Sequence, residues 1–279
     1  MEYDIFISCK SEDYKYAEDI YNFLTSKGFN TFLAPKELRI HGDAEFRKTI
    51  SLAMKSAYHM IIFASDAEYV DSTWVYYEWD MFLNAKLKGF KEGQIMTILK
   101  DVNVEDINMD LWKYESFTYE NYKDKLLDYV VTPRYSKRQK DLSDSIAINT
   151  VYKKNKNYEN DLVHLISEFS VAHGNINIDH RDLEFLYGMD EVAYTLIPNF
   201  EFKDTYSHVL ALKDKIIREK LYFTHFVIYI KFAKGSNGYT FQELSDILSV
   251  IYKTNPDAEI KWGYSEGGFR NELFIIMAR

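Results

Sequence analysis

Hydrophobic residues from position 1 to about 130 fall alternately into short continuous runs and into stretches with helical spacing. Continuous runs between polar residues predict β-strands, whereas apolar residues three or four apart predict helices that bury one face. The strands are expected at YDIFIS (3–8), FNTFLA (29–34), HMIIFAS (59–65) and QIMTIL (94–99), and the helices at 13–28, 44–57 and from 72 onward. This alternation predicts an α/β fold in which helices cover both faces of a parallel sheet and ligands bind at the carboxyl ends of its strands.

The pattern changes at residues 132–157, where apolar periodicity is weak and basic residues cluster around Arg138 and Lys154. Runs of like charge are usually solvated. We therefore interpret this stretch as a linker between a first domain, 1–131, and a second domain, 158–279. A site for an anionic ligand is the alternative.

Residues 158–279 show a different order of elements. Helices are expected at 158–173, from about 179 and at 239–255, and strands at 223–233, 258–266 and 271–279. The sequence Glu-Gly-Gly between the last two strands is a turn signal. Because strands outnumber crossover helices, an α+β domain with helices on one face of its sheet is expected.

Composition narrows the class of protein. The net charge of −9 argues against a general nucleic-acid binder, which needs a basic surface to neutralise phosphates. Cys9 is the single cysteine, so no intramolecular disulfide can form, as is typical of a reducing cytoplasm. The apolar run from residue 3 leaves no room for a signal peptide, and no run is long enough to span a membrane. The histidines lack metal-ligand spacing and no phosphate-binding glycine loop occurs, so we expect a soluble cytoplasmic protein without a metal site.

The stretch STWVYYEWD (72–80) sets acids among aromatic residues. If a helix begins after Ser72, a natural N-cap, its sheet-facing stripe consists of Val75, Trp79 and Phe82. Trp74 and Glu78 then lie together on a neighbouring face. Two interpretations follow: Glu78 is a surface acid beside core aromatics, or it stands at the lip of a pocket that Trp74 helps to wall.

The first domain resembles a TIR (Toll/interleukin-1 receptor) domain, a flavodoxin-like fold, over nearly its whole length. Similar to this family are YDIFISC with KSED after it (first strand and loop), GFNTFLAPKELRIHGD (second strand and active-site cap) and SAYHMIIFAS (third strand). The most specific match is STWVYYE (72–78), which resembles the family's S-x-W-C-x-x-E with Val75 in place of cysteine. In NAD-cleaving TIR domains this glutamate is catalytic, so the resemblance implies that role for Glu78.

The resemblance also implies substrate contacts by Ser8, Cys9, Lys10, Leu38, Trp74 and Tyr77. The nicotinamide of NAD+ is already a cationic leaving group. A single carboxylate can therefore suffice, by stabilising an oxocarbenium-like ribose. Aromatic walls can stack on a base and exclude water. NAD+ is then the substrate, and no cofactor is expected.

Some residues in these segments depart from the family pattern or have a second interpretation. Ala34 stands where many NAD-cleaving relatives carry an acid, which bears on product choice or substrate pose. The loop PKELRIHGD lacks the proline-glycine pair common in signalling adaptors, which argues against a pure adaptor. Cys9 has no obvious histidine partner, so a buried or loop residue is favoured over a nucleophile.

The segment GNINIDHRDLEFL (174–186) also has two interpretations. Asp179 can cap a helix and Asp182 can lie in its first turn, both favourable at the positive helix end. The segment also resembles the synergy loop of FtsZ, which enters the nucleotide pocket of the next subunit; Asn177, Asp179 and Asp182 match its N-x-D-x-x-D pattern. The elements from 158 onward follow the order of the FtsZ carboxyl-terminal domain. The glycine-rich GTP-binding half of FtsZ has no counterpart, so this chain is not expected to bind GTP by itself.

Together the resemblances imply a bacterial TIR NAD+ glycohydrolase that acts in antiphage defence and is gated by oligomerisation or by a trigger. The second domain would sense that trigger, drive self-association through its own or TIR–TIR contacts, or dock on an FtsZ-like or phage-derived partner. Nucleic acid and membranes are not expected as partners. The alternatives are a TIR cyclase that makes a cyclic ADP-ribose signal, a non-catalytic TIR adaptor, and a nucleoside-processing transferase that ignores NAD+.

Overall fold

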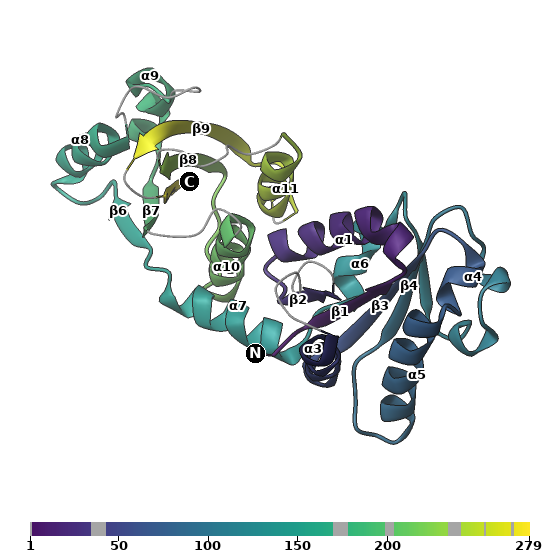
Figure 1. Cartoon of the computed structure of the whole chain (residues 1–279). Coiled ribbons are helices and arrows are strands. Elements are labelled where there is room, and N and C mark those ends of the chain that lie inside the picture. Colours follow the sequence, from purple (N-terminus) through teal and green to yellow (C-terminus); the bar gives the residue numbers. More distant parts are fainter. Residues whose placement is uncertain are drawn as a thin grey trace. The chain divides into compact units, whose positions relative to one another are not determined.

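The structure is a computed structural model that describes residues 2–34, 43–169, 178–198, 204–233, 241–253, 255–268 and 271–279. The chain divides into two compact units, Met1–Lys137 and Arg138–Arg279, each with its own sheet (Figure 1).

The first unit is built on a five-stranded parallel sheet in the order β2-β1-β3-β4-β5. Its strands are β1 (Ile5–Cys9), β2 (Thr31–Leu33), β3 (His59–Ala64), β4 (Ile95–Leu99) and β5 (Glu115–Thr118). Its helices are α1 (Tyr14–Ser26), α3 (Asp43–Ser56), α4 (Ala67–Val70), α5 (Thr73–Leu87) and α6 (Tyr122–Tyr129), with short 3-10 turns η1 (Ser11–Asp13), η2 (Val104–Asp106) and η3 (Met109–Leu111). The predicted α/β fold is confirmed.

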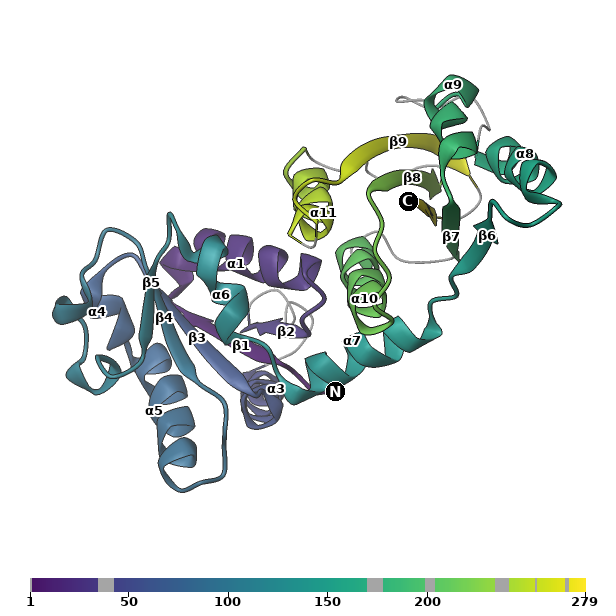
Figure 2. The ribbon, with the colours of Figure 1, turned by 180° about the vertical axis from the view of Figure 1, so that it is seen from behind.

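Alternate residues of strands β1 to β4 pack into cores on opposite faces of this sheet, and helices cover both faces (Figures 1 and 2). In β1, Phe6 joins the core cluster that contains residues of α3 and α5. Its neighbours Ile5 and Ile7 join the cluster that contains residues of α1 and α6. Burial on both faces explains why these strands appear in the sequence as continuous apolar runs.

Strand β5 and helix α6 were not predicted from the sequence. In β5, only Phe117 is buried, so no apolar run marks this edge strand. The strand depends on its parallel pairing with β4.

The end of α1 was predicted correctly. Gly28 follows the helix with φ of 85°. Its N–H donates to the Thr25 carbonyl at 2.9 Å, and the Phe29 N–H donates to the Leu24 carbonyl at 3.2 Å. These two bonds are a Schellman motif, in which glycine adopts the left-handed conformation without steric cost.

The second unit is built on a mixed sheet in the order β6-β7-β10-β8-β9, in which only β8 and β9 pair in parallel among the described strands. Its strands are β6 (Asn149–Tyr152), β7 (Glu191–Pro198), β8 (His225–Ala233), β9 (Glu259–Gly268) and β10 (Glu272–Ala278). Its helices are α8 (Tyr158–Phe169), α9 (His180–Leu183), α10 (Thr205–Arg218) and α11 (Phe241–Tyr252), with a 3-10 turn η4 (Glu184–Gly188).

One expectation for this unit was wrong. Its helices cover both faces of the sheet, because β8 residues alternate between a core shared with α10 and α11 and a core shared with α8. The last two strands of the chain are not neighbours in the sheet, because β8 lies between β9 and β10. Strands β6 and β7 and helix α10 were not predicted.

The interpretation of residues 132–157 as a linker also needs correction, because α7 (Pro133–Ser145) and β6 lie within them. The Thr132 hydroxyl accepts a hydrogen bond from the Tyr135 N–H at 2.9 Å and donates to Asp4 at 2.8 Å. A threonine N-cap followed by proline is a helix-start signal. The sequence analysis gave more weight to the basic residues Lys137, Arg138 and Lys140, which are exposed in the structure.

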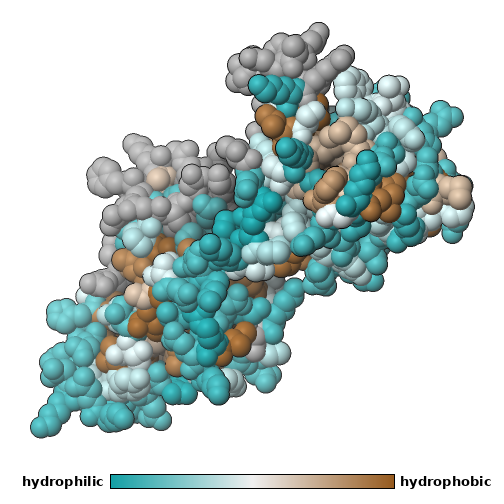
Figure 3. Space-filling model, turned by 90° about the horizontal axis from the view of Figure 1, so that it is seen from below, coloured by the Kyte–Doolittle hydropathy of each residue, from teal (hydrophilic) through white to brown (hydrophobic). Residues whose placement is uncertain are grey.

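Hydrophilic residues predominate on the face drawn in Figure 3, with hydrophobic patches between them. Within the described residues, no helix combines the length and the apolar character that crossing a membrane requires.

Candidate active site

Glu78 is one of the buried residues of helix α5. Its residue is 6% exposed, and it shares the inner part of the helix with Val75, Trp79 and Phe82. Both interpretations of the sequence placed this acid at the surface or at a pocket lip, and both were wrong about its burial. Trp79 holds this end of the helix in place, because its indole N–H donates to the Val70 carbonyl at 2.9 Å.

The Glu78 carboxylate is hydrogen-bonded to a residue of β1. The Ser8 hydroxyl donates to Glu78 Oε2 at 2.5 Å, across 70 positions of sequence. Ser8 is itself 1% exposed and lies next to Cys9, the last residue of the strand. The fold therefore brings together two of the predicted site residues at the carboxyl end of a parallel strand, where ligand sites of such sheets lie.

Burial changes the acidity of Glu78. Loss of hydration raises the pKa of its carboxyl from 4.5 to about 7, and the hydrogen bond from Ser8 acts in the opposite direction. The group is thus close to half ionised at neutral pH. A carboxyl with this pKa can change protonation state during a reaction at physiological pH.

Cys9 lies beside this pair as a neutral thiol. Burial, then the negative charges of Asp13 and Glu78, raise the thiol pKa to about 12. A thiol that stays protonated is a poor nucleophile. The raised pKa therefore gives no support to a nucleophilic role for Cys9.

The loop after β1 is anchored by Asp13, which the sequence analysis did not single out. Asp13 is 1% exposed and accepts hydrogen bonds from the Ser65 N–H at 2.9 Å and the Ser65 hydroxyl at 2.5 Å. Lys10, in the same loop, lies 4.1 Å from the centre of the Tyr69 ring and 3.2 Å from Glu12 Oε1. Ser65 follows β3 and Asp13 follows β1, and β1 and β3 are neighbours in the sheet. A hydroxyl and an acid at these two positions are the sequence pattern that could have identified the contact.

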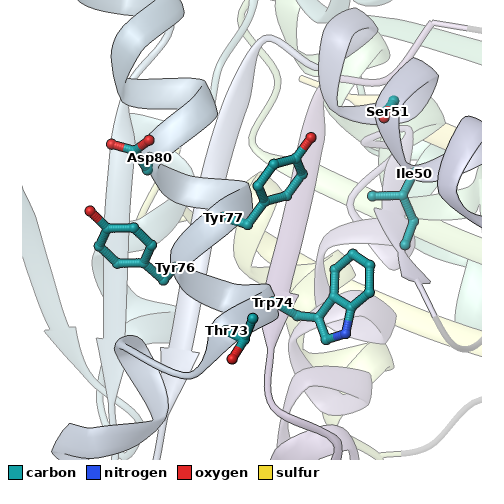
Figure 4. A pocket seen from close by; sticks show the side chains of 7 residues that line it. All are labelled: Ile50, Ser51, Thr73, Trp74, Tyr76, Tyr77 and Asp80. Carbon is teal, nitrogen blue, oxygen red and sulfur yellow. The ribbon is translucent and has the colours of Figure 1, made fainter.

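Trp74 and Tyr77 line a surface groove of about 520 Å³ between α5 and α3 (Figure 4). The two rings meet edge to face at 6.4 Å, and both project toward Ile50 of α3. The other lining residues are Ser51, Thr73, Tyr76 and Asp80. Glu78 is not among the residues that line this groove. Leu38 lies outside the described residues.

The acids of the synergy-like segment cap a helix. Asp179 accepts from the Asp182 N–H at 3.0 Å, and Asp182 accepts from the Asp179 N–H at 3.1 Å, which forms a capping box at the start of α9. Lys261 donates to the Asp182 carbonyl at 2.8 Å. The N-cap interpretation is confirmed. Asn177 lies outside the described residues.

No cluster of His, Cys, Asp and Glu side chains suited to a metal ion occurs in the part of the chain that the structure describes. The functional groups at the end of β1 and on α5 are the Glu78 carboxyl, the Ser8 hydroxyl and the rings of Trp74 and Tyr77.

Residues 5–127 match the TIR domain family. This match covers the sheet, Ser8 and Glu78, so the first unit is a TIR domain. No curated protein shows a significant match to the chain.

Solved structures similar to the chain include TIR proteins and FtsZ. TIR domains of the activated Roq1 resistosome share 26% identity at a TM-score of 0.30, over 37% of this chain and 60% of that chain. A TIR-STING receptor from C. gigas shares 14% identity at a TM-score of 0.37, over 94% and 89%. An empty FtsZ dimer from M. jannaschii shares 10% identity at a TM-score of 0.32, over 100% and 89%. The chain thus spans less than two thirds of the Roq1 chain, and at these TM-scores the likenesses carry no weight for function.

Proposed function

We propose that the protein is an NAD+ glycohydrolase in which Glu78 is the catalytic residue. The observation that carries this proposal is the buried Glu78–Ser8 pair at the carboxyl end of β1 in a TIR domain. A single buried carboxylate suits a reaction whose leaving group needs no protonation.

In the proposed reaction, the bond between the nicotinamide nitrogen and the ribose C1′ breaks, and its electron pair leaves with neutral nicotinamide. The positive charge that develops on the ribose is stabilised by the ionised Glu78 carboxylate. Water then attacks C1′ and releases one proton to the solvent, which gives ADP-ribose. Ser8 would hold the carboxylate in position and favour its ionised form, because a hydroxyl donor stabilises the anion.

The burial of Glu78 supports a gated enzyme. In this proposal, neighbouring groups move before substrate contacts the carboxylate of Glu78, a residue that is 6% exposed. Assembly of TIR domains, or a trigger bound by the second unit, would supply this rearrangement. In a bacterial cell, NAD+ depletion after infection would then halt growth and limit phage spread.

The experiment that tests the proposal is nicotinamide release from NAD+ by the full chain over a wide range of protein concentrations. We expect the rate per chain to rise with concentration and to fall at least a hundredfold in Glu78→Gln. Glu105→Gln, an exposed acid outside the site, serves as the matched control. Release that is unchanged in Glu78→Gln would contradict the role of Glu78.

Chromatography of the same reaction separates the glycohydrolase from a cyclase, because only the latter yields a cyclic ADP-ribose. A non-catalytic adaptor is the other alternative, and the aromatic groove beside Trp74 gives it one specific support as a partner surface. Absence of turnover at every concentration, together with TIR self-association that survives Glu78→Gln, would favour the adaptor.

A further inference from the structure

A groove of about 440 Å³ runs between helix α11 and strand β9 in the second unit. Its lining consists of Leu244, Ser245, Leu248, Ser249 and Tyr252 from α11, Lys253 directly after the helix, and Trp262 from β9. The helix residues recur at three- and four-residue spacing, so they form one face along nearly the whole length of α11.

Strand β9 forms one edge of its sheet. It pairs with β8 over its length of 10 residues, and no strand in the described part of the chain pairs with its other side. An edge strand presents alternate N–H and C=O groups that lack ladder partners. These groups are a template for a further extended chain.

The two faces of β9 differ. Ile260, Trp262 and Tyr264 pack toward the core shared with α10 and α11. On the other face, Glu259 lies 3.5 Å from His225 and Lys261 lies 3.4 Å from Asp182. The polar face is thus engaged within the unit, whereas the face toward α11 offers an apolar floor beside the open edge.

We propose that the free edge of β9 binds an extended peptide segment of a partner protein as an added strand. Every second side chain of that peptide would enter the groove, against Trp262 and Leu248. A peptide is the occupant because the edge supplies a row of backbone donors and acceptors that an extended chain alone can match in register.

Lys253 sets the charge preference of this site. It is the charged residue of the groove lining and forms no ion pair within the described residues. An acidic residue at the end of the peptide that lies near Lys253 would complete the contact. This inference does not depend on NAD+ cleavage, so failure of one leaves the other intact.

The test uses the full chain and a synthetic library of extended peptides in which apolar and polar residues alternate, with an acidic or a basic residue at one end. We expect saturable binding by fluorescence anisotropy, stronger for the acidic set. Hydrogen–deuterium exchange should show peptide-dependent protection of the amides of Glu259–Gly268.

Two substitutions locate the contact. Tyr252→Glu should weaken binding at least tenfold, whereas Tyr222→Glu, at a similarly exposed tyrosine outside the groove, should leave it unchanged; the two side chains belong to residues 44% and 58% exposed. Lys253→Glu should reverse the preference, so that the basic peptides bind better than the acidic ones.

Several outcomes would overturn the proposal. These are a library without binders, protection confined to other strands, or equal effects of the two tyrosine substitutions. Protection of Glu259–Gly268 that rises with protein concentration in the absence of peptide would show that a second copy of the chain occupies the edge instead.

Discussion

Glu78 shows how burial changes the chemistry of one residue. The same carboxyl at the surface would be fully ionised at neutral pH, whereas here the pKa is raised to about 7. Ser8 is the hydrogen-bond donor that opposes this shift. The acid therefore affects both stability and the proposed reaction, and each can be measured separately.

The first prediction concerns stability. Because the pKa rises from 4.5 to about 7 on folding, the folded state keeps a proton that the unfolded chain releases between these values. The contribution of Glu78 is complete below pH 4.5 and is lost as the pH rises through 7. Glutamine does not titrate. The free energy of unfolding of Glu78→Gln relative to the unmodified chain should thus rise by about 3 kcal/mol between pH 4 and pH 8.

Urea unfolding monitored by tryptophan fluorescence checks this prediction. Burial lowers the pKa of His59 to about 4, so its contribution to the free energy of unfolding decreases as the pH falls, opposite to that of Glu78. His59 is present in both proteins, so its contribution cancels in the difference. A difference that does not vary with pH would contradict the buried, proton-binding state of Glu78.

The second prediction concerns Ser8. In Ser8→Ala the carboxyl stays buried but loses its donor, so its pKa should rise further. The acidic limb of the pH profile of nicotinamide release should move to higher pH by about one unit. Ser11→Ala removes a hydroxyl that donates to Glu12 at the surface and is the control. Equal profiles for both variants would show that Ser8 does not position Glu78.

Among the secondary-structure elements, helices α1 and α10 end in the same way but with different residues at the left-handed position. Helix α1 ends on Gly28 with φ of 85°, but α10 makes the same pair of terminal bonds around Lys220, whose φ is 55°. A side chain in this left-handed conformation clashes with its own backbone. The second unit therefore contains a strained position at a place where glycine is preferred.

The third prediction follows from this contrast. Lys220→Gly should raise the free energy of unfolding of the second unit by roughly 0.5 to 1 kcal/mol, because the strain is removed. Gly28→Ala should lower that of the first unit by a similar amount. Thermal unfolding of both variants beside the unmodified chain gives the comparison. A loss of stability in Lys220→Gly would mean that the lysine side chain makes contacts that outweigh the strain.

Two compact units with separate cores define the molecule as a whole. The first matches the TIR domain family and contains the Glu78–Ser8 pair. The second is built on a mixed five-stranded sheet. Its acids Asp179 and Asp182 are used in a capping box.

The fourth prediction is that GTP alone has no effect on the chain. Addition of millimolar GTP should leave Tm unchanged and release no phosphate, because no phosphate-binding glycine loop occurs in the sequence. The non-hydrolysable GTP analogue is tested in parallel, so that binding without turnover is also detected. A saturable rise in Tm with either nucleotide would contradict the prediction.

The sequence alone determined the first four strands of the parallel sheet, the Gly28 helix end and the S-x-W-x-x-x-E segment. Buried strands and helix caps leave local patterns, since both depend on neighbouring residues. It did not reveal β5, β6 or the order of the second sheet. These strands have few buried residues and are defined by pairing partners far along the chain.

Only the tertiary structure decided the state of the candidate site. The helical spacing of Trp74 and Glu78 predicted a shared, accessible face, but packing of α5 on the sheet buries Glu78 and leaves Trp74 half exposed in a separate groove. The Ser8–Glu78 bond, the anchor between Asp13 and Ser65 and the raised pKa all depend on contacts between segments distant in sequence. Hydration is lost only when those segments meet, so local sequence could identify the acid but could not determine its protonation.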